Sequence, residues 1–153
     1  MARVARRRSV SATPEQVWEL VADPYSLPRW WPRTTRVEAV DVAEDGSASQ
    51  WTKVLETAEG RAVRADYHRL DITERERYGW EQEVKGTPFQ RHLRRASVEI
   101  RLQGQEGGGT EVTISSEQML RGMSRLGSPM MRRGQGEILE EALDGIERVL
   151  EAG

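Results

Sequence analysis

The chain has 153 residues, of which 37% are hydrophobic and 31% are charged, and its 23 basic and 25 acidic side chains give a net charge of −2. This near balance excludes a simple polyanion-binding domain, which would show a large basic excess, and the length predicts one domain over residues 1–153. The sequence has no cysteine, which excludes disulfides, thiol nucleophiles and cysteine-based zinc sites.

The N-terminal part of the chain predicts one strand and two short helices. A strand is expected over Val4–Val10. A helix start follows at Thr13-Pro14-Glu15-Gln16, where the threonine caps the helix, the proline takes its first position and the glutamine completes a capping box. This helix ends at Asp23-Pro24, because the residue before a proline avoids the helical region. A second short helical segment is expected over Tyr25–Pro32.

The middle of the chain predicts six further strands. They are expected over Arg36–Val42, Ser49–Thr57, Arg61–Thr73, Arg77–Lys85, Arg91–Gln103 and Thr110–Leu120. The connections between them are short and most contain glycine, most clearly the loop at residues 103–109. Consecutive strands are therefore expected to pair antiparallel.

A long helix is expected from about Ser128 to Ala152, or from an earlier start near Ser124. Its apolar stripe at helical spacing comprises Leu126, Met130, Ile138, Ala142, Ile146 and Val149, and it is widened by Leu139, Leu143 and Leu150. Gly134 interrupts the stripe, and it either leaves room for a ligand beneath the helix or marks a kink. The order of elements predicts an α+β fold, a bent antiparallel seven-stranded sheet with two short helices and the long C-terminal helix across its concave face.

Two motifs in the first 32 residues resemble those of helix-grip proteins. The first is Ser11-Ala12-Thr13-Pro14-Glu15-Gln16-Val17-Trp18, and the second is Asp23-Pro24-Tyr25-Ser26-Leu27-Pro28-Arg29-Trp30-Trp31-Pro32. With the long C-terminal helix, they make the chain similar to the SRPBCC superfamily (START and birch-pollen-allergen-like proteins), in its bacterial polyketide cyclase/dehydrase-type branch. The resemblance implies the helix-grip fold and the binding of lipids, polyketides, quinones or other apolar ligands. It implies no particular catalytic residue.

A bent sheet that grips one helix is expected to enclose a cavity, and the alternation within the strands selects the side chains that face it. The expected cavity residues are Trp31, Tyr67, Tyr78, Trp80, Gln82, His92, Arg94, Ser116, Met130, Gly134 and Ile138. Arg94 would anchor a ligand carboxylate or phenolate, and His92 or Tyr67 would transfer a proton. Alternatively, the start of the strand that carries His92 and Arg94 is solvated, and both face water. The alternation around Trp51 is ambiguous, so a partly exposed side chain is expected there.

The expected function is the binding of a small hydrophobic or aromatic ligand, lipid- or polyketide-like, between the sheet and the C-terminal helix. Two alternatives stay open: an enzyme of the polyketide cyclase/dehydratase type, and an interaction protein that handles a quinone or lipid. No cofactor and no metal are expected, because the two histidines have no matching cluster of carboxylates.

The expected partner is a small apolar or aromatic molecule rather than a nucleic acid, and the protein is expected to be a monomer or homodimer. Stable membrane insertion is not expected, because no window approaches 18 consecutive apolar residues. The first eight residues include four arginines and no apolar stretch, so we expect no signal peptide and a cytoplasmic location.

Overall fold

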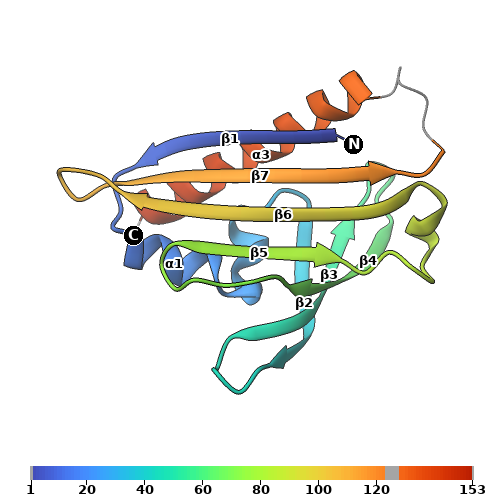
Figure 1. The fold of residues 1–153 in the computed structure, drawn as a ribbon, viewed down its shortest axis with the longest axis horizontal. Coiled ribbons are helices and arrows are strands. Elements are labelled where there is room, and N and C mark those ends of the chain that lie inside the picture. Colours follow the sequence, from blue (N-terminus) through green and yellow to red (C-terminus); the bar gives the residue numbers. More distant parts are fainter. Residues whose placement is uncertain (1, 123–127, 153) are drawn as a thin grey trace.

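The computed structural model describes residues 2–122 and 128–152, and it has the order of elements expected from the sequence (Figure 1). The elements are β1 (Ala2–Val10), α1 (Pro14–Val21), the 3₁₀-helix η1 (Pro24–Ser26), α2 (Leu27–Trp30), β2 (Thr34–Val42), β3 (Ala48–Glu56), β4 (Ala62–Arg69), β5 (Arg77–Gln82), the 3₁₀-helix η2 (Pro88–Arg91), β6 (Leu93–Gly104), β7 (Thr110–Leu120) and α3 (Ser128–Ala152).

The seven strands form a single antiparallel sheet in the order β1-β7-β6-β5-β4-β3-β2. Strands β2 to β7 are joined in sequence as neighbours, while β1 closes the other edge against β7. The pairing of β2 with β3 is irregular, with register shifts after Glu38 and a positive φ of 54° at Ala39. Bulges of this kind bend a strand and increase its twist. The expected bent seven-stranded sheet is confirmed.

Helix α1 begins as its sequence predicts. The Thr13 hydroxyl accepts a hydrogen bond from the Gln16 backbone N–H at 3.3 Å, and the Gln16 side-chain carbonyl accepts one from the Thr13 backbone N–H at 2.8 Å. These two bonds form the capping box and satisfy amide groups that the first turn leaves unpaired. The helix then buries Val17, Leu20 and Val21 against the core.

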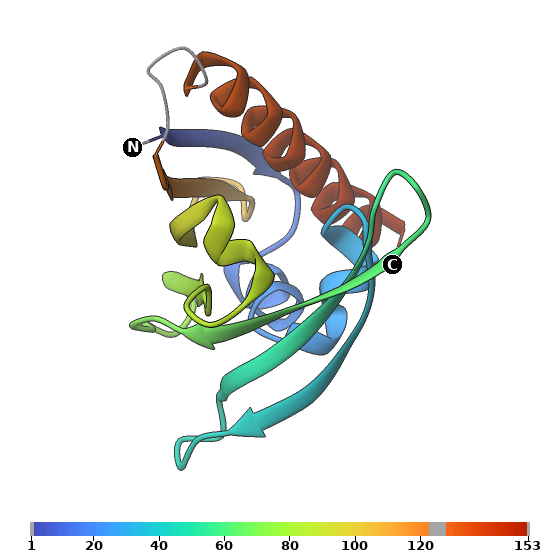
Figure 2. The same ribbon diagram turned by 90° about the vertical axis from the view of Figure 1, so that its right-hand side faces the viewer.

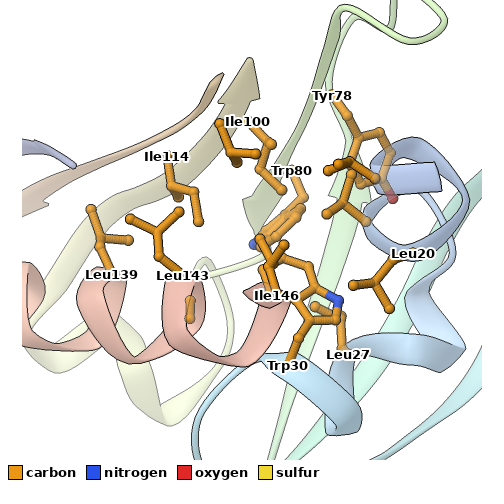
Figure 3. Packing of buried hydrophobic residues seen from close by; sticks show 14 of the residues in the cluster. Leu20, Leu27, Trp30, Tyr78, Trp80, Ile100, Ile114, Leu139, Leu143 and Ile146 are labelled. Carbon is orange, nitrogen blue, oxygen red and sulfur yellow. The ribbon is translucent and has the colours of Figure 1, made fainter. Parts of the chain in front are cut away.

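Helix α3 runs along the open side of the curved sheet, and the short helices α1 and α2 lie near its C-terminal end (Figure 2). Leu139, Leu143 and Ile146 point from α3 toward Ile114, Ile100 and Trp80 of the sheet (Figure 3). Where α2 crosses α3, the residue of α3 at the contact is Gly145. A Cβ atom on this residue would lie 2.2 Å from the carbonyl oxygen of Trp30 in α2. Glycine therefore permits this close approach of the two helices.

The sequence predicted that the first half of α3 buries Met130 and Gly134, and this prediction was wrong. Met130 is 79% exposed and Gly134 is exposed, whereas Gln135 and Leu139 are buried. Successive residues of a helix are rotated by about 100° around its axis. A buried face centred on Gln135 and Leu139 therefore leaves the preceding residues, Gly134 and Ile138, exposed. Leu126, which the sequence placed on the same stripe, and the earlier helix start near Ser124 lie outside the described residues.

Trp51 was expected to be partly exposed, and it is 2% exposed. It pairs with Tyr67 across β3 and β4, which places both rings on the concave face of the sheet. The Trp51 ring stacks on Tyr67 and Tyr78, with centroids 6.3 and 6.4 Å away. The aromatic side chains of the middle strands thus form one packed group under α3.

Candidate functional site

A cavity of about 450 Å³ lies between the sheet and the N-terminal half of α3. This volume is within the range of about 300–1,000 Å³ typical of pockets that bind small molecules. The described residues that line it are Trp31, Pro32, Arg33, Lys53, Leu55, Glu56, Thr57, Ala58, Val63, Tyr67, Trp80, Gln82, Phe89, Ala96, Ser97, Val98, Ser116, Gln118, Gln135, Ile138 and Leu139. Most of this wall is apolar, and the exposed Arg33, Glu56 and Ala58 lie at the mouth.

Aromatic rings form one side of the cavity. Trp31 packs edge-on against Trp80 with ring centroids 5.5 Å apart, and Trp80 is in similar edge-on contact with Trp51 at 6.2 Å. Tyr67 stacks on Trp51 from the neighbouring strand. Because these rings pack against one another, this side of the cavity is an apolar aromatic surface with fixed geometry.

A buried lysine lies among these rings. Lys53 is 4% exposed, and its Nζ lies 5.2 Å from the centroid of the Trp31 ring and 4.9 Å from that of Tyr67. These distances are within the range in which an ammonium group is attracted to an aromatic face. Within residues 2–122 and 128–152, no carboxylate forms a salt bridge with this amine.

Burial shifts the proton affinity of both titratable groups deep in the cavity. Removal from water lowers the pKa of Lys53 from 10.5 to about 7, because desolvation disfavours the charged amine. The same effect raises the pKa of the Tyr67 phenol above its usual value, so that this group stays neutral at physiological pH. The Lys53 amine is therefore divided between its charged and neutral forms near neutral pH.

Two glutamine side chains on the cavity wall have polar atoms without partners among the described residues. Gln82 of β5 has an unpaired Nε2, and Gln135 of α3 has an unpaired Nε2 and an unpaired Oε1. Gln135 is 6% exposed, and Ser116 of β7 lies on the same wall at 7%. Buried amides without partners are unfavourable, and a ligand that supplies the missing hydrogen bonds would gain affinity from them.

The structure brings together part of the residue set expected from the sequence. On the cavity wall lie Trp31, Tyr67, Trp80, Gln82, Ser116 and Ile138. Whether these side chains contact a ligand stays a prediction. Tyr78 does not line the cavity, because its ring is enclosed in the core between Trp18 and Trp51. Met130 and Gly134 also lie away from the cavity, because the inward face of α3 is centred on other residues.

His92 and Arg94 do not point inward, and the structure agrees with the alternative that both face water. Both residues are exposed and neither lines the cavity. His92 follows η2 as its C-cap, before β6 begins, and a register shift between Leu93 and Arg95 breaks the alternation at the start of the strand. The inward phase applies only from Ala96 onward. This overturns the roles suggested for the pair as ligand anchor and proton donor.

Sequence reasoning missed Lys53 as a cavity residue. A signal was present, because alternation places Lys53 on the same face as Trp51 and Leu55. Pairing β3 with β4 in register puts Lys53 opposite Ala65 and next to Tyr67, which was expected to point inward. The sequence has only two lysines, at positions 53 and 85, and 21 arginines make up the rest of its 23 basic residues.

Other charged groups have structural partners at the surface. Arg8 of β1 forms ion pairs with Glu140, Asp144 and Glu147 of α3, so its charge is paired within the protein. The Nδ1 atom of His68 in β4 lies 2.5 Å from the Oε1 atom of Glu83, and neither residue lines the cavity. Among the described residues, no group of three or more histidine, aspartate or glutamate side chains is placed to hold a metal ion. None of the described helices has the length and apolarity needed to cross a membrane.

Comparisons with known proteins agree with this fold. The model of the family described as polyketide cyclase / dehydrase and lipid transport matches residues 1–151, whereas no curated protein matches the sequence. A START superfamily protein from Mycobacterium smegmatis has a similar structure, with a TM-score of 0.82 and 17% identity over 99% of both chains.

Two aromatase/cyclases share the fold as well. The Zhui aromatase/cyclase from Streptomyces sp. R1128 gives a TM-score of 0.76 at 19% identity over 97% of this chain and 93% of its own. The di-domain aromatase/cyclase BexL, from the BE-7585A biosynthetic pathway, gives a TM-score of 0.76 at 21% identity over 99% of this chain and 47% of its own. At these identities the likeness concerns the fold alone.

Proposed function

The chain belongs to the polyketide cyclase / dehydrase and lipid transport family, and we propose that it binds a small hydrophobic or aromatic molecule in the cavity between the sheet and α3. The observation that carries this proposal is the cavity of about 450 Å³ beside a well-packed core. Protein interiors are normally filled to the density of organic crystals, so a preformed apolar space of this size is typical of a ligand site.

The cavity wall supplies the two things that such a ligand needs. The rings of Trp31, Tyr67 and Trp80 offer apolar surface, whose burial contributes roughly 25 cal/mol per Å². A few polar groups on three different elements, Lys53, Gln82 and Gln135, would orient the ligand by hydrogen bonds. This combination of an apolar wall and sparse polar groups supports binding of a lipid- or polyketide-like molecule.

The first test asks whether a ligand accompanies the protein. Native mass spectrometry of freshly purified protein should show a mass above that of the chain alone, and solvent extraction should release a small apolar molecule. The second test uses the neutral fluorescent probe N-phenyl-1-naphthylamine, which should bind and become brighter in an apolar cavity.

A cavity-filling variant makes the second test specific. Ala96 of β6 lines the cavity, so Ala96→Phe should abolish probe binding, whereas Arg94→Phe, at an exposed position of the same strand, should leave it intact. Thermal melts of both variants establish that they are folded. Failure of the wild type to bind the probe, or equal binding by Ala96→Phe, would refute the proposed cavity function.

A second candidate function is an enzyme of the cyclase/dehydratase type, and the placement of Lys53 beside Tyr67 favours it. An amine with a pKa of about 7 can accept a proton from a carbon next to a ligand carbonyl, and the neutral phenol can donate one. Turnover of a poly-β-ketone substrate that is lost in Lys53→Met while probe binding persists would support this candidate. Binding without turnover supports a carrier or binding protein.

A further inference from the structure

We propose that the molecule held in the cavity is an apolar carboxylic acid whose carboxylate pairs with the Nζ of Lys53. The inference rests on the proposed binding function and adds the chemical class of the ligand. The cavity wall carries the buried amine of Lys53, and it also carries the amide nitrogens of Gln82 and Gln135, which have no acceptor among the described residues. A ligand with an apolar body and a negatively charged oxygen group at one end would accept hydrogen bonds from these nitrogen donors.

The donors come from three elements that meet at the cavity. Lys53 on β3, Gln82 on β5 and Gln135 on α3 each present nitrogen to the cavity wall, and the two amide nitrogens have no acceptor among the described residues. The Oε1 of Gln135 is also unpaired and could accept a bond from a ligand hydroxyl or a bound water. A carboxylate is acceptor-only, with two oxygens, and can therefore bind the amine and an amide together.

The charges facing Lys53 favour an anionic ligand. Among the described residues that line the cavity, the other titratable or charged groups are Tyr67 on β4, Glu56 at the end of β3, and Arg33 before β2. Tyr67 is neutral, while Glu56 and Arg33 are exposed at the mouth. The lining residues of β5, β6, β7, η2 and α3 include no charged side chain. The cavity residues that the structure describes therefore supply no buried anion to an ammonium group there.

A carboxylate would remove an unfavourable feature of the unliganded protein. An ammonium group buried without a partner loses its hydration, and the faces of Trp31 and Tyr67 replace only part of that loss. Pairing with a carboxylate gives a charge-assisted hydrogen bond in an environment that water screens weakly. A neutral ligand of the same shape would gain only apolar contacts and amide hydrogen bonds.

The pairing makes binding depend on pH in a defined way. Below about pH 7 the amine of the free protein already carries its proton, so carboxylate binding should be nearly independent of pH until the ligand itself is protonated. Above about pH 7 the free protein must take up a proton to form the ion pair. The affinity should then fall by about tenfold for each pH unit.

The test uses two matched probes, 2-naphthoate and its neutral isostere 2-naphthamide, measured by isothermal titration calorimetry between about pH 6 and pH 9. At pH 6.5 naphthoate should bind wild-type protein at least about tenfold more tightly than naphthamide, consistent with a buried charge-assisted pair. Its affinity should fall above pH 7, with uptake of close to one proton at pH 8.5, whereas naphthamide binding should not change with pH.

Variants identify the amine. Lys53→Met should make the two probes bind alike and remove the pH dependence, and Lys53→Gln is a second variant for the case in which the first does not fold. Lys85→Met, at the exposed second lysine, is the matched control and should behave as wild type.

The outcomes separate this inference from the function on which it rests. If wild-type protein binds naphthamide and N-phenyl-1-naphthylamine but shows no preference for naphthoate, the ligand is not recognised through its acid group, and the inference is overturned while the binding function stands. If none of the three probes binds, both are overturned. A preference for naphthoate that persists in Lys53→Met and Lys53→Gln would also overturn the assignment to Lys53.

Discussion

Replacing Lys53 with methionine is expected to stabilise the unliganded protein at neutral pH. The folded state lowers the pKa of this amine from 10.5 to about 7, so at pH values between these two the unfolded chain binds a proton that the folded chain does not. Stability therefore falls as the pH is lowered from 10.5 to 7, and it changes little further below 7. Methionine removes this titration and keeps an unbranched side chain of similar length in the same space.

The size of the effect follows from the change in proton affinity. Each pKa unit corresponds to about 1.4 kcal/mol, so a fall from 10.5 to about 7 lowers the free energy of unfolding by roughly 5 kcal/mol at neutral pH, as an upper value. Loss of the contacts between the amine and the two aromatic faces offsets about 0.5–2 kcal/mol of this gain. We expect Lys53→Met to be more stable than wild type by about 2–4 kcal/mol at pH 7.

The assay is urea unfolding followed by tryptophan fluorescence at pH 7, 8 and 9, with wild type, Lys53→Met and Lys85→Met compared at each pH. Other titrating groups cancel in the difference between wild type and variant. The stability advantage of Lys53→Met should shrink by about 2 kcal/mol between pH 7 and pH 9, because wild type regains stability as the pH rises. Lys85→Met should stay close to wild type throughout, since Lys85 is exposed.

A direct readout is available because the sequence has only two lysines. Titration of protein labelled with carbon-13 at the lysine ε-carbons should give one signal with a midpoint near pH 7, and this signal should be missing from Lys53→Met. The lowered pKa of Lys53 is refuted if no lysine signal titrates near pH 7, or if Lys53→Met is less stable than wild type at pH 7 with no dependence on pH.

Three further predictions concern the helices and His92, which the sequence placed in the cavity and the structure places outside it. Gly145→Ala should destabilise the protein by about 1–3 kcal/mol or more in thermal or urea unfolding, because the added Cβ would lie 2.2 Å from the Trp30 carbonyl oxygen. Gly134→Ala is its matched control on the same helix, and it should stabilise by up to about 1 kcal/mol since open space surrounds that position; a loss of stability there would contradict the placement. Thr13→Ala should cost about 1 kcal/mol through loss of the capping box, measured by urea unfolding, and an unchanged midpoint would show that the cap contributes nothing. His92→Ala should leave the affinity for N-phenyl-1-naphthylamine within about twofold of wild type, because this side chain is exposed outside the cavity; a large loss of affinity would restore it to the site.

The order of elements followed from the sequence because its signals are local. The capping box at Thr13 predicted the start of α1, and short glycine-containing connections predicted antiparallel neighbours in the sheet. Alternation predicted that Trp80 and Gln82 share one face of β5, and both line the cavity. Each of these features depends on residues a few positions apart, so the sequence contains the information needed.

The composition of the cavity depended on tertiary structure. His92 and Arg94 were placed inward because the alternation of β6 was assumed to continue toward its N-terminal end. A register shift between Leu93 and Arg95 interrupts the alternation there. Gly134 was placed on the inward stripe of the C-terminal helix, where it could leave room for a ligand beneath the helix, but the rotation of α3 on the sheet buries Gln135 and leaves Gly134 exposed. A period is a local property, whereas its phase is decided by the partner strand or by the surface on which a helix packs.

Lys53 shows most clearly what the sequence determined and what only the fold decided. Alternation by itself establishes that it shares a face with Trp51 and Leu55. That this face is buried, that Trp31 and Tyr67 lie within about 5 Å of the amine, and that no buried carboxylate lies beside it among the described residues were settled by elements far apart in the chain. The proton affinity of an amine depends on the water and charges around it. The lowered pKa of Lys53 is therefore a consequence of its burial between the sheet and α3 in the folded protein.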